Sequence, residues 1–229
     1  MLNPVDMHAI EAAIAVKEAV GGTVTILTMG TALAGEVMRD GIAVGADKGV
    51  LVSDERMAGS DTLATGKILA KAIEKVGGAD IIFTGKRSTD GDTGQIPPAV
   101  AQYLGMSLIS YAESFEVEGT TVKATRKNNG GIETVEAQLP IVCSVMETMN
   151  APRQPKIRGK MNAKKAVFDV LRLEDIGLDV KEAGKAGSAT KVTELFAPEP
   201  HPMGTMVQGN TATQAAKNLV DILVSQKIL

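Results

Sequence analysis

The first 105 residues alternate between segments with helical periodicity and short apolar runs. Helical patterns cover residues 6–20, 32–44 and 61–76, and another helix is expected after Pro97. Short strands are expected at residues 23–28, 49–52 and 79–83. We expect Asp6 to cap the first helix and Gly21-Gly22 to end it. The alternation predicts an α/β fold with a doubly wound, mostly parallel sheet and helices on both faces.

The pattern changes after Gly105. Residues 114–118, 121–126 and 133–138 alternate polar and apolar side chains, and Asn128-Asn-Gly-Gly131 is typical of a hairpin turn. Residues 139–145 predict a buried strand, whereas the Gly/Ala/Pro-rich residues 184–209 cannot form a core alone. A last helix is expected at 211–226. We therefore predict an α/β domain over residues 1–175 and an arm with a helix over 176–229 that packs on a partner.

A polar Gly-rich loop joins the strand at 79–83 to the following helix. It reads Thr84-Gly-Lys-Arg-Ser-Thr-Asp-Gly-Asp-Thr-Gly-Gln95, and Pro97 and Pro98 follow it. The glycines allow the backbone to turn tightly against a ligand. The prolines suit a first helical turn, so the free N–H groups before them would face whatever lies over the loop. From this chemistry alone, a phosphate site and an ordinary turn are equally good interpretations.

A second polar segment runs from Asp54 to Thr65. Ser60, Asp61 and Thr62 are all good N-cap residues, and Thr65 lies within one turn of them. Hydroxyls and free N–H groups would therefore cluster at this helix start. Taken alone, the segment is best explained as a helix cap.

Composition narrows the classes of function. Aromatic residues make up 3% of the chain, Trp is absent and the formal net charge is -3, which disfavours nucleic-acid binding. Cys143 is the single cysteine, so no intrachain disulfide can form and a buried thiol in a reducing compartment is expected. No apolar span of 18 residues and no signal peptide are found, which predicts a cytoplasmic protein without a membrane span. No catalytic acid, base or nucleophile and no metal-ligand set is predicted.

Several motifs in register resemble the electron-transfer flavoprotein β subunit (FixA-like) family. They are Asp90-Gly-Asp-Thr-Gly-Gln95, Asn3-Pro-Val-Asp6, Met29-Gly30 and Asn150-Ala-Pro-Arg153 followed by Arg158-Gly-Lys-Met-Asn-Ala-Lys-Lys165. Residues 126–144 also resemble the family signature, with Asn129 where an acidic residue is usual and Cys143 where an aliphatic one is. The similarity covers nearly the whole chain. It implies an adenine nucleotide alpha hydrolase-like fold and a heterodimer with an electron-transfer flavoprotein α subunit.

The resemblance also bears on the cofactor. Residues 54–65 are similar to the Asp-Arg-x-Phe-x-Gly-x-Asp-Thr-x-Ala-Thr pattern of bifurcating members, which hold FAD where other members hold AMP. Arg56 stands one residue late and Met57 replaces the aromatic residue. FAD is therefore expected, with AMP as the alternative. The implied cofactor-binding residues are Asn3, Pro4, Val5, Asp6, Met29, Gly59, Asp61, Thr62, Thr65, Asp90, Gly91, Asp92, Thr93, Gly94, Gln95, Ile96, Pro97, Pro98, Ala99, Val100 and Ala101.

By resemblance, the chain would take electrons from NADH and divide them between ferredoxin or flavodoxin and an acyl-CoA dehydrogenase-like partner. Residues 181–190 would be the loop that docks on this dehydrogenase, although their composition alone suggests a solvated linker. Two alternatives stay open: a non-bifurcating electron-transfer flavoprotein with structural AMP, and a non-redox adenine-nucleotide-binding protein. The family's sheet begins with a strand, and we expect this strand to be missing here, since the sequence starts at the Asn3-Pro4 turn.

Overall fold

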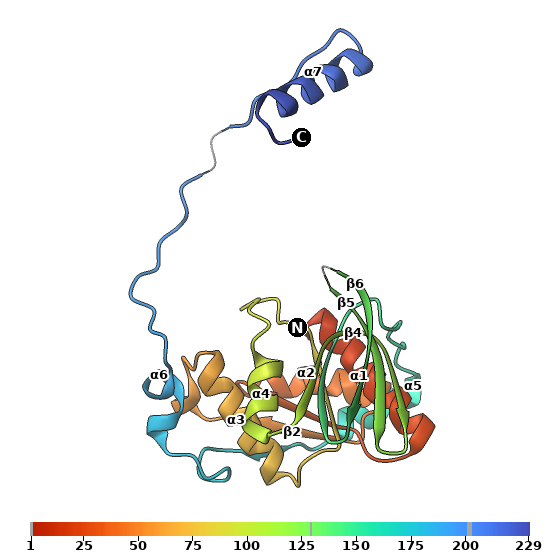
Figure 1. Ribbon diagram of the computed structural model, residues 1–229. Coiled ribbons are helices and arrows are strands. Elements are labelled where there is room, and N and C mark those ends of the chain that lie inside the picture. The colour runs from red at the N-terminus through yellow and green to blue at the C-terminus, as the bar shows by residue number, and fades with distance from the viewer. Residues whose placement is uncertain (1, 129, 201–202) are drawn as a thin grey trace. The chain divides into compact units, whose positions relative to one another are not determined.

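The structure is a computed structural model that describes residues 2–128, 130–200 and 203–229. It divides into two compact units, Met1–Lys191 and Val192–Leu229, which are treated separately. Figure 1 shows the helices and strands of both units. The Asn129 position of the expected hairpin turn lies outside the described residues, but the two strands flanking it are present.

The first unit has the α/β architecture that the sequence predicts, with its strands in two sheets. One sheet has three parallel strands in the order β1-β2-β8, and the other has five in the order β3-β7-β4-β5-β6. In the second sheet β3, β7 and β4 are parallel, and β5 and β6 extend it antiparallel. The strands are β1 (Thr25–Met29), β2 (Lys48–Val52), β3 (Ile81–Gly85), β4 (Ser107–Glu118), β5 (Thr121–Asn128), β6 (Gly131–Gln138), β7 (Ile141–Val145) and β8 (Asp169–Leu171).

Helices connect these strands. They are α1 (Pro4–Val20), α2 (Ala34–Val44), α3 (Thr62–Lys75), α4 (Ile96–Leu104), α5 (Ile157–Lys165) and α6 (Gly184–Gly187), with short 3₁₀ segments η1 (Glu55–Met57) and η2 (Val180–Glu182). The expected cap of α1 was wrong. Pro4 takes the first helical position, which suits its fixed φ and missing N–H, so Asn3 is the N-cap residue and Asp6 lies within the first turn.

The boundary of the α/β unit also differs from the expected one at residue 175. Leu173, Ile176, Leu178 and Ala183 are buried in one apolar cluster with Val52, Met57, Ile68 and Ala72. Residues 176–191 therefore belong to the α/β unit, because they complete a core that packs on β2 and α3. The sequence did not reveal this, since the apolar positions in that stretch follow neither a helical nor a strand period.

The second unit contains α7 (Ala212–Ser225), close to the expected range. Thr211 caps it, because its hydroxyl accepts a hydrogen bond of 3.2 Å from the Gln214 N–H. No residue of α7 is buried, and Leu219, Val220 and Val224 are about half exposed. In the described parts of the chain, no helix combines the length and the apolar character needed to cross a membrane.

Candidate functional site

The Gly-rich loop follows the carboxyl end of β3 and leads into α4. Arg87 closes it through an ion pair with Asp92, whose φ is 50°. Gly94 has a φ of 63°, a conformation in which a side chain is strained. Within the described residues, the N–H groups of Thr93, Gly94 and Gln95 form no hydrogen bond. They lie at the start of α4, where the helix dipole favours a negative charge, so the loop can bind an anion.

Only the first part of the expected 90–101 segment is accessible. Pro97, Val100 and Ala101 are buried, and the last two pack with Val142 in an apolar cluster. Their side chains therefore belong to the core and help to fix the position of α4. The accessible positions are residues 90–96, 98 and 99.

The beginning of α1 lies against the same strand end. The Gly85 N–H donates a hydrogen bond of 2.8 Å to the Asp6 carboxylate, and Asn3 Nδ2 donates one of 3.0 Å to the Arg87 carbonyl. Burial raises the pKa of the Asp6 carboxyl, although hydrogen bonds from Gly85 and Asn3 oppose that effect. Asn3, Pro4, Val5 and Asp6 are thus next to the loop, with Val5 itself buried.

Two buried polar atoms at this site have no partner. Asn3 Oδ1 and Thr84 Oγ1 are inaccessible and form no hydrogen bond with the described residues. Buried polar groups are rarely left unpaired in a native protein, so each such atom requires an explanation. A polar ligand at the end of β3 would supply the partners. The N–H groups of residues 93–95 and the unpaired atoms Asn3 Oδ1 and Thr84 Oγ1 therefore fit a phosphorylated nucleotide.

The second polar segment forms η1 and the start of α3. The Asp61 carboxylate accepts hydrogen bonds from the Ala64 N–H (3.0 Å) and the Thr190 N–H (2.9 Å), and the Asp61 N–H donates to Ser188 Oγ. These interactions lower the pKa of Asp61, with the Ala64 hydrogen bond as the largest cause. Asp61 is therefore a helix cap and a tether for residues 188–190.

Gly59 takes part in the same connection. Its φ is 80°, and its carbonyl accepts a hydrogen bond of 3.2 Å from the Ser188 hydroxyl. Arg56, in contrast, is held by Asp54 and Glu174. Hydrogen bonds from Arg56 hold the pKa of the Asp54 carboxyl far below its usual range. Arg56 is therefore engaged with two carboxylates rather than free at the site.

The two polar loops meet at one hydrogen bond. The Thr62 hydroxyl donates to Gln95 Oε1 over 2.6 Å, which joins the start of α3 to the start of α4. The helices also approach closely, because a Cβ on Gly66 would lie 2.5 Å from the Cβ of Ala99. Thr65 lies near this junction, and its hydroxyl has no hydrogen bond to another described residue. The structure thus combines two segments that are 30 residues apart in sequence into one candidate site.

Met29 is the last residue of β1. It is half-buried and packs against the cluster that contains Val52 and Leu173. Cys143 is fully buried in β7, and burial raises the pKa of its thiol to about 12. A thiol with so high a pKa is inert at neutral pH, as expected for a structural residue.

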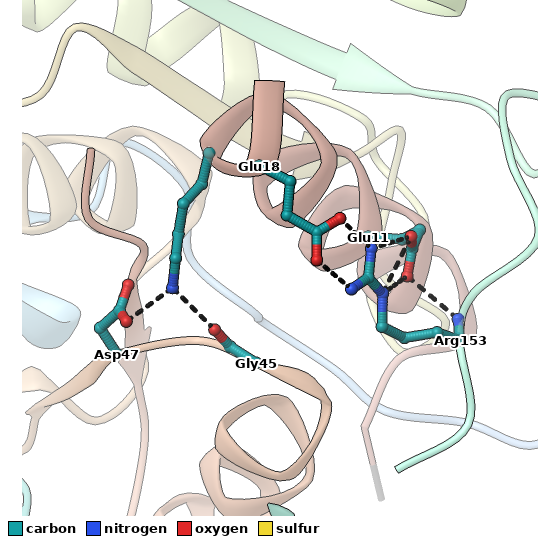
Figure 2. A network of polar contacts seen from close by, with 6 residues as sticks. Glu11, Glu18, Gly45, Asp47 and Arg153 are labelled. Atoms are coloured by element: carbon teal, nitrogen blue, oxygen red, sulfur yellow. Dashed lines mark hydrogen bonds and ion pairs between the residues drawn. The ribbon is translucent and has the colours of Figure 1, made fainter. Parts of the chain in front are cut away.

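Sequence reasoning did not find the polar network that holds residues 150–153 against α1. Figure 2 shows Arg153 between Glu11 and Glu18. Arg153 lies 2.9 Å from Glu11 Oε1 and 2.6 Å from Glu18 Oε1, and Lys17 forms an ion pair with Asp47. The Asn150 side chain donates to the carbonyl of His8 over 2.9 Å. The sequence signal was present, since the Asn150-Ala-Pro-Arg153 motif was identified, but its glutamate partners lie more than 130 residues earlier.

The sequence was compared with known proteins. Residues 1–176 match the electron transfer flavoprotein domain family. The electron transfer flavoprotein subunit beta of Megasphaera elsdenii is 39% identical over 238 residues, covering 100% of this chain and 88% of the relative. The caffeyl-CoA reductase-Etf complex subunit CarD of Acetobacterium woodii is 36% identical over 230 residues, with the same coverage of each chain. Protein FixA of Bradyrhizobium diazoefficiens is 36% identical over 231 residues, covering 97% of this chain and 80% of the relative.

Proposed function

Because this chain belongs to the electron transfer flavoprotein β subunit and FixA family, we propose that it binds FAD and acts in flavin-based electron bifurcation. The observation that carries the proposal is the Thr62 to Gln95 hydrogen bond. It makes one site from two polar segments. FAD extends further than AMP, so a site built from two adjoining segments favours the larger cofactor.

Each part of the site has a separate task in this proposal. The N–H groups of Thr93, Gly94 and Gln95 would bind the diphosphate, because they precede or begin α4 and form no hydrogen bond within the described residues. Asn3 Oδ1 and Thr84 Oγ1 would receive hydrogen bonds from the cofactor, which removes the cost of leaving them unpaired. Thr62 and Thr65 would lie beside the flavin, with Gly59 and Asp61 fixing the loop that carries them.

The redox chemistry belongs to the cofactor, and the protein supplies binding, orientation and electrostatics. When bound, FAD can accept a hydride from NADH and pass its two electrons on singly, one to ferredoxin or flavodoxin and one toward a second FAD in the α subunit. An acyl-CoA dehydrogenase-like enzyme would receive the second electron. The A. woodii relative is named as a subunit of a complex with a CoA-ester reductase, which supports this class of partner.

Two other functions fit parts of the same geometry. An anion-binding loop with unpaired polar atoms would also hold AMP as a structural nucleotide, with the single redox FAD in the α subunit. A non-redox nucleotide-binding protein would need no α subunit and would carry no flavin. The polar junction between α3 and α4 argues for FAD over both, since neither alternative needs Thr62 and Thr65 near a ligand.

The deciding experiment measures the cofactors of the protein purified together with its α subunit. Two FAD molecules per heterodimer are expected, and one-electron reduction of ferredoxin should require NADH together with the dehydrogenase substrate. One FAD with one AMP would contradict bifurcation and favour structural AMP. A colourless protein with no α subunit bound would contradict both flavoprotein functions.

A substitution at Gly94 tests the phosphate loop. Gly94→Val puts a β-branched residue at a φ of 63°, so the loop must change shape or carry about 1–3 kcal/mol of strain. We expect FAD to bind about 5- to 150-fold more weakly. Gly105→Val is the matched control, because Gly105 also has a positive φ of 65° but lies at the other end of α4. Equal FAD retention in wild type and Gly94→Val would contradict the loop assignment.

A further inference from the structure

Tyr111 interrupts β4 at an irregular position. The pairing of β4 with β7 is regular up to Ile109 and resumes only at Ala112, and the pairing with β5 shifts just beyond Ala112. Within this bulge Tyr111 has a φ of 58°. A large aromatic residue rarely adopts that conformation, because its Cβ approaches the following carbonyl oxygen. A bulge of this kind bends the strand and redirects one side chain.

The bulge is held by a buried hydroxyl. The Tyr111 N–H donates a hydrogen bond of 3.0 Å to Ser144 Oγ, and Ser144, the penultimate residue of β7, is 2% exposed. Its neighbours Cys143 and Val145 are fully buried. Ser144 thus satisfies the N–H group that the irregular pairing leaves without a strand partner, and the bulge is a fixed feature of the sheet.

The redirected side chain reaches the Gly-rich loop. A Cβ on Gly94 would lie 3.4 Å from the Tyr111 hydroxyl oxygen, and at the same distance from the Lys86 carbonyl oxygen. The Tyr111 side chain is not packed into the core, since the residue is 45% exposed. Its hydroxyl forms no hydrogen bond with another described residue. A phenol donor without a partner among the described residues therefore lies beside Gly94.

Packing does not explain this arrangement. The ring fills no apolar cluster, and a residue that tolerates positive φ, such as Gly or Asn, would occupy the position without strain. Strained residues that persist in a fixed scaffold concentrate at ligand sites. The strain, the buried Ser144 partner and the free hydroxyl next to Gly94 are accounted for together if the phenol binds the ligand of the loop.

We propose that Tyr111 is a further cofactor-binding residue, whose hydroxyl donates a hydrogen bond to the diphosphate held by the loop around Gly94. The inference rests on the proposed nucleotide site, but it adds a ligand from β4, a strand of the second sheet. It also assigns a purpose to Ser144, which is a positioning residue because it holds the bulge. The cofactor would thereby be bound by two parts of the chain, the loop before α4 and strand β4.

The test measures the affinity of the full chain for FAD in three variants. Tyr111→Phe removes only the hydroxyl, and loss of a hydrogen bond to a charged group should weaken FAD binding about 10- to 100-fold. Tyr111→Asn removes the ring and relieves the strain, so it should bind FAD at least as weakly while its thermal midpoint stays equal to wild type or rises. Tyr103→Phe is the matched control, because Tyr103 is the other tyrosine of the chain and lies on α4 at the far end from Gly94.

A spectroscopic readout needs no comparison of affinities. The chain has no Trp and two Tyr, so in Tyr103→Phe all tyrosine emission comes from Tyr111. Saturating ADP, which carries the diphosphate without a flavin, should change this emission, and inorganic phosphate should change it less. Unchanged emission with ADP bound, or unchanged FAD affinity in Tyr111→Phe, would overturn the inference while leaving the nucleotide site intact. Failure of wild type to bind FAD, ADP and AMP would overturn the proposed function and the inference with it.

Discussion

At the scale of single residues, the site is built from side chains that serve either the fold or a ligand. Asp61 is fully engaged within the protein, through Ala64 and Thr190, whereas the Thr65 hydroxyl, one turn further along α3, forms no hydrogen bond with another described residue. The sequence placed these residues together, but it could not separate their roles. That separation depends on Thr190, which lies 129 residues away and has no recognisable pattern.

Substitutions at these two positions should therefore behave differently. Thr65→Val keeps the size of the side chain and removes only the hydroxyl, so the free energy of unfolding should change by about 0.5 kcal/mol or less. We expect it to lose bound FAD or to shift the flavin reduction potential. Asp61→Ala should lose about 1–2 kcal/mol of stability, because it removes a helix cap. Parallel losses of stability and flavin in Thr65→Val would favour a purely structural role for the segment.

At the scale of secondary structure elements, the sequence was most informative where a regular period continued for several turns. Helices α2, α3 and α7 end within two residues of their expected limits. It failed where tertiary contacts replace periodicity. Strand β4 begins at Ser107 rather than 114, because its first residues pair with buried β7 and do not alternate. Helix α5 was not predicted, since its basic residues and two glycine or asparagine positions gave no apolar period.

The network around Arg153 connects two elements that the sequence could not pair. The Glu11 side chain is 13% exposed, and hydrogen bonds from Arg153 are the largest cause of the lowered pKa of both Glu11 and Glu18. We expect Arg153→Lys to cost about 1–2 kcal/mol at pH 7, since one ammonium cannot replace a guanidinium that contacts two carboxylates. Chemical denaturation would measure this difference.

The stability difference between wild type and Arg153→Lys should depend on pH, and the lowered pKa values fix the sign of this dependence. Because the folded-state pKa of each glutamate lies below its unfolded value of 4.5, the network stabilises the protein above that pH and is lost as pH falls through the lowered pKa. The difference in the free energy of unfolding between wild type and Arg153→Lys should therefore disappear at low pH. Lys71→Gln is the control, because Lys71 and Glu74 form an exposed pair on α3 and should contribute little at any pH. A difference that stays the same at every pH below 4.5, down to the pH at which the protein unfolds, would contradict this explanation.

At the scale of the whole molecule, residues 181–190 are a folded part of the α/β unit rather than a free linker. The Gly184 N–H donates to Ser60 Oγ over 2.8 Å, and Lys67 forms an ion pair with Glu182. A surface loop that is rigidly attached beside the proposed flavin site suits a docking element better than a flexible one would. This structure also changes the choice of experiment, because a deletion in the loop would release Asp61 and disturb the cofactor.

Charge reversal tests docking without that complication. Lys181 and Lys185 are exposed, and Lys181→Glu with Lys185→Glu should slow association with an acidic dehydrogenase surface, most strongly at low salt. The rate of flavin reduction by NADH should be unchanged. Lys75→Glu together with Lys123→Glu makes the same change in net charge at two exposed positions outside this loop. Electron delivery that is unaffected at every ionic strength would mean that residues 181–190 do not contact the dehydrogenase.

The second unit gives the last prediction, which concerns the α subunit. Helix α7 buries none of its residues and leaves Val220 49% and Val224 55% exposed, one turn apart on the same side of the helix. The three apolar clusters of the chain's described part all lie within residues 1–191. The first unit therefore has its own core, whereas α7 has an apolar face that needs a partner. We propose that this partner is the α subunit.

Ending the chain after Lys191 should therefore leave the unfolding midpoint of the first unit within a few degrees of that of the full chain, and should abolish copurification with the α subunit. Val220→Glu together with Val224→Glu should weaken the heterodimer in the full chain, because two charges would enter an apolar interface. Asp221→Lys changes the charge of the same helix without touching those two side chains and should have a smaller effect. A truncated chain that still binds the α subunit at full affinity would show that the first unit alone makes the heterodimer, and α7 would then require another partner.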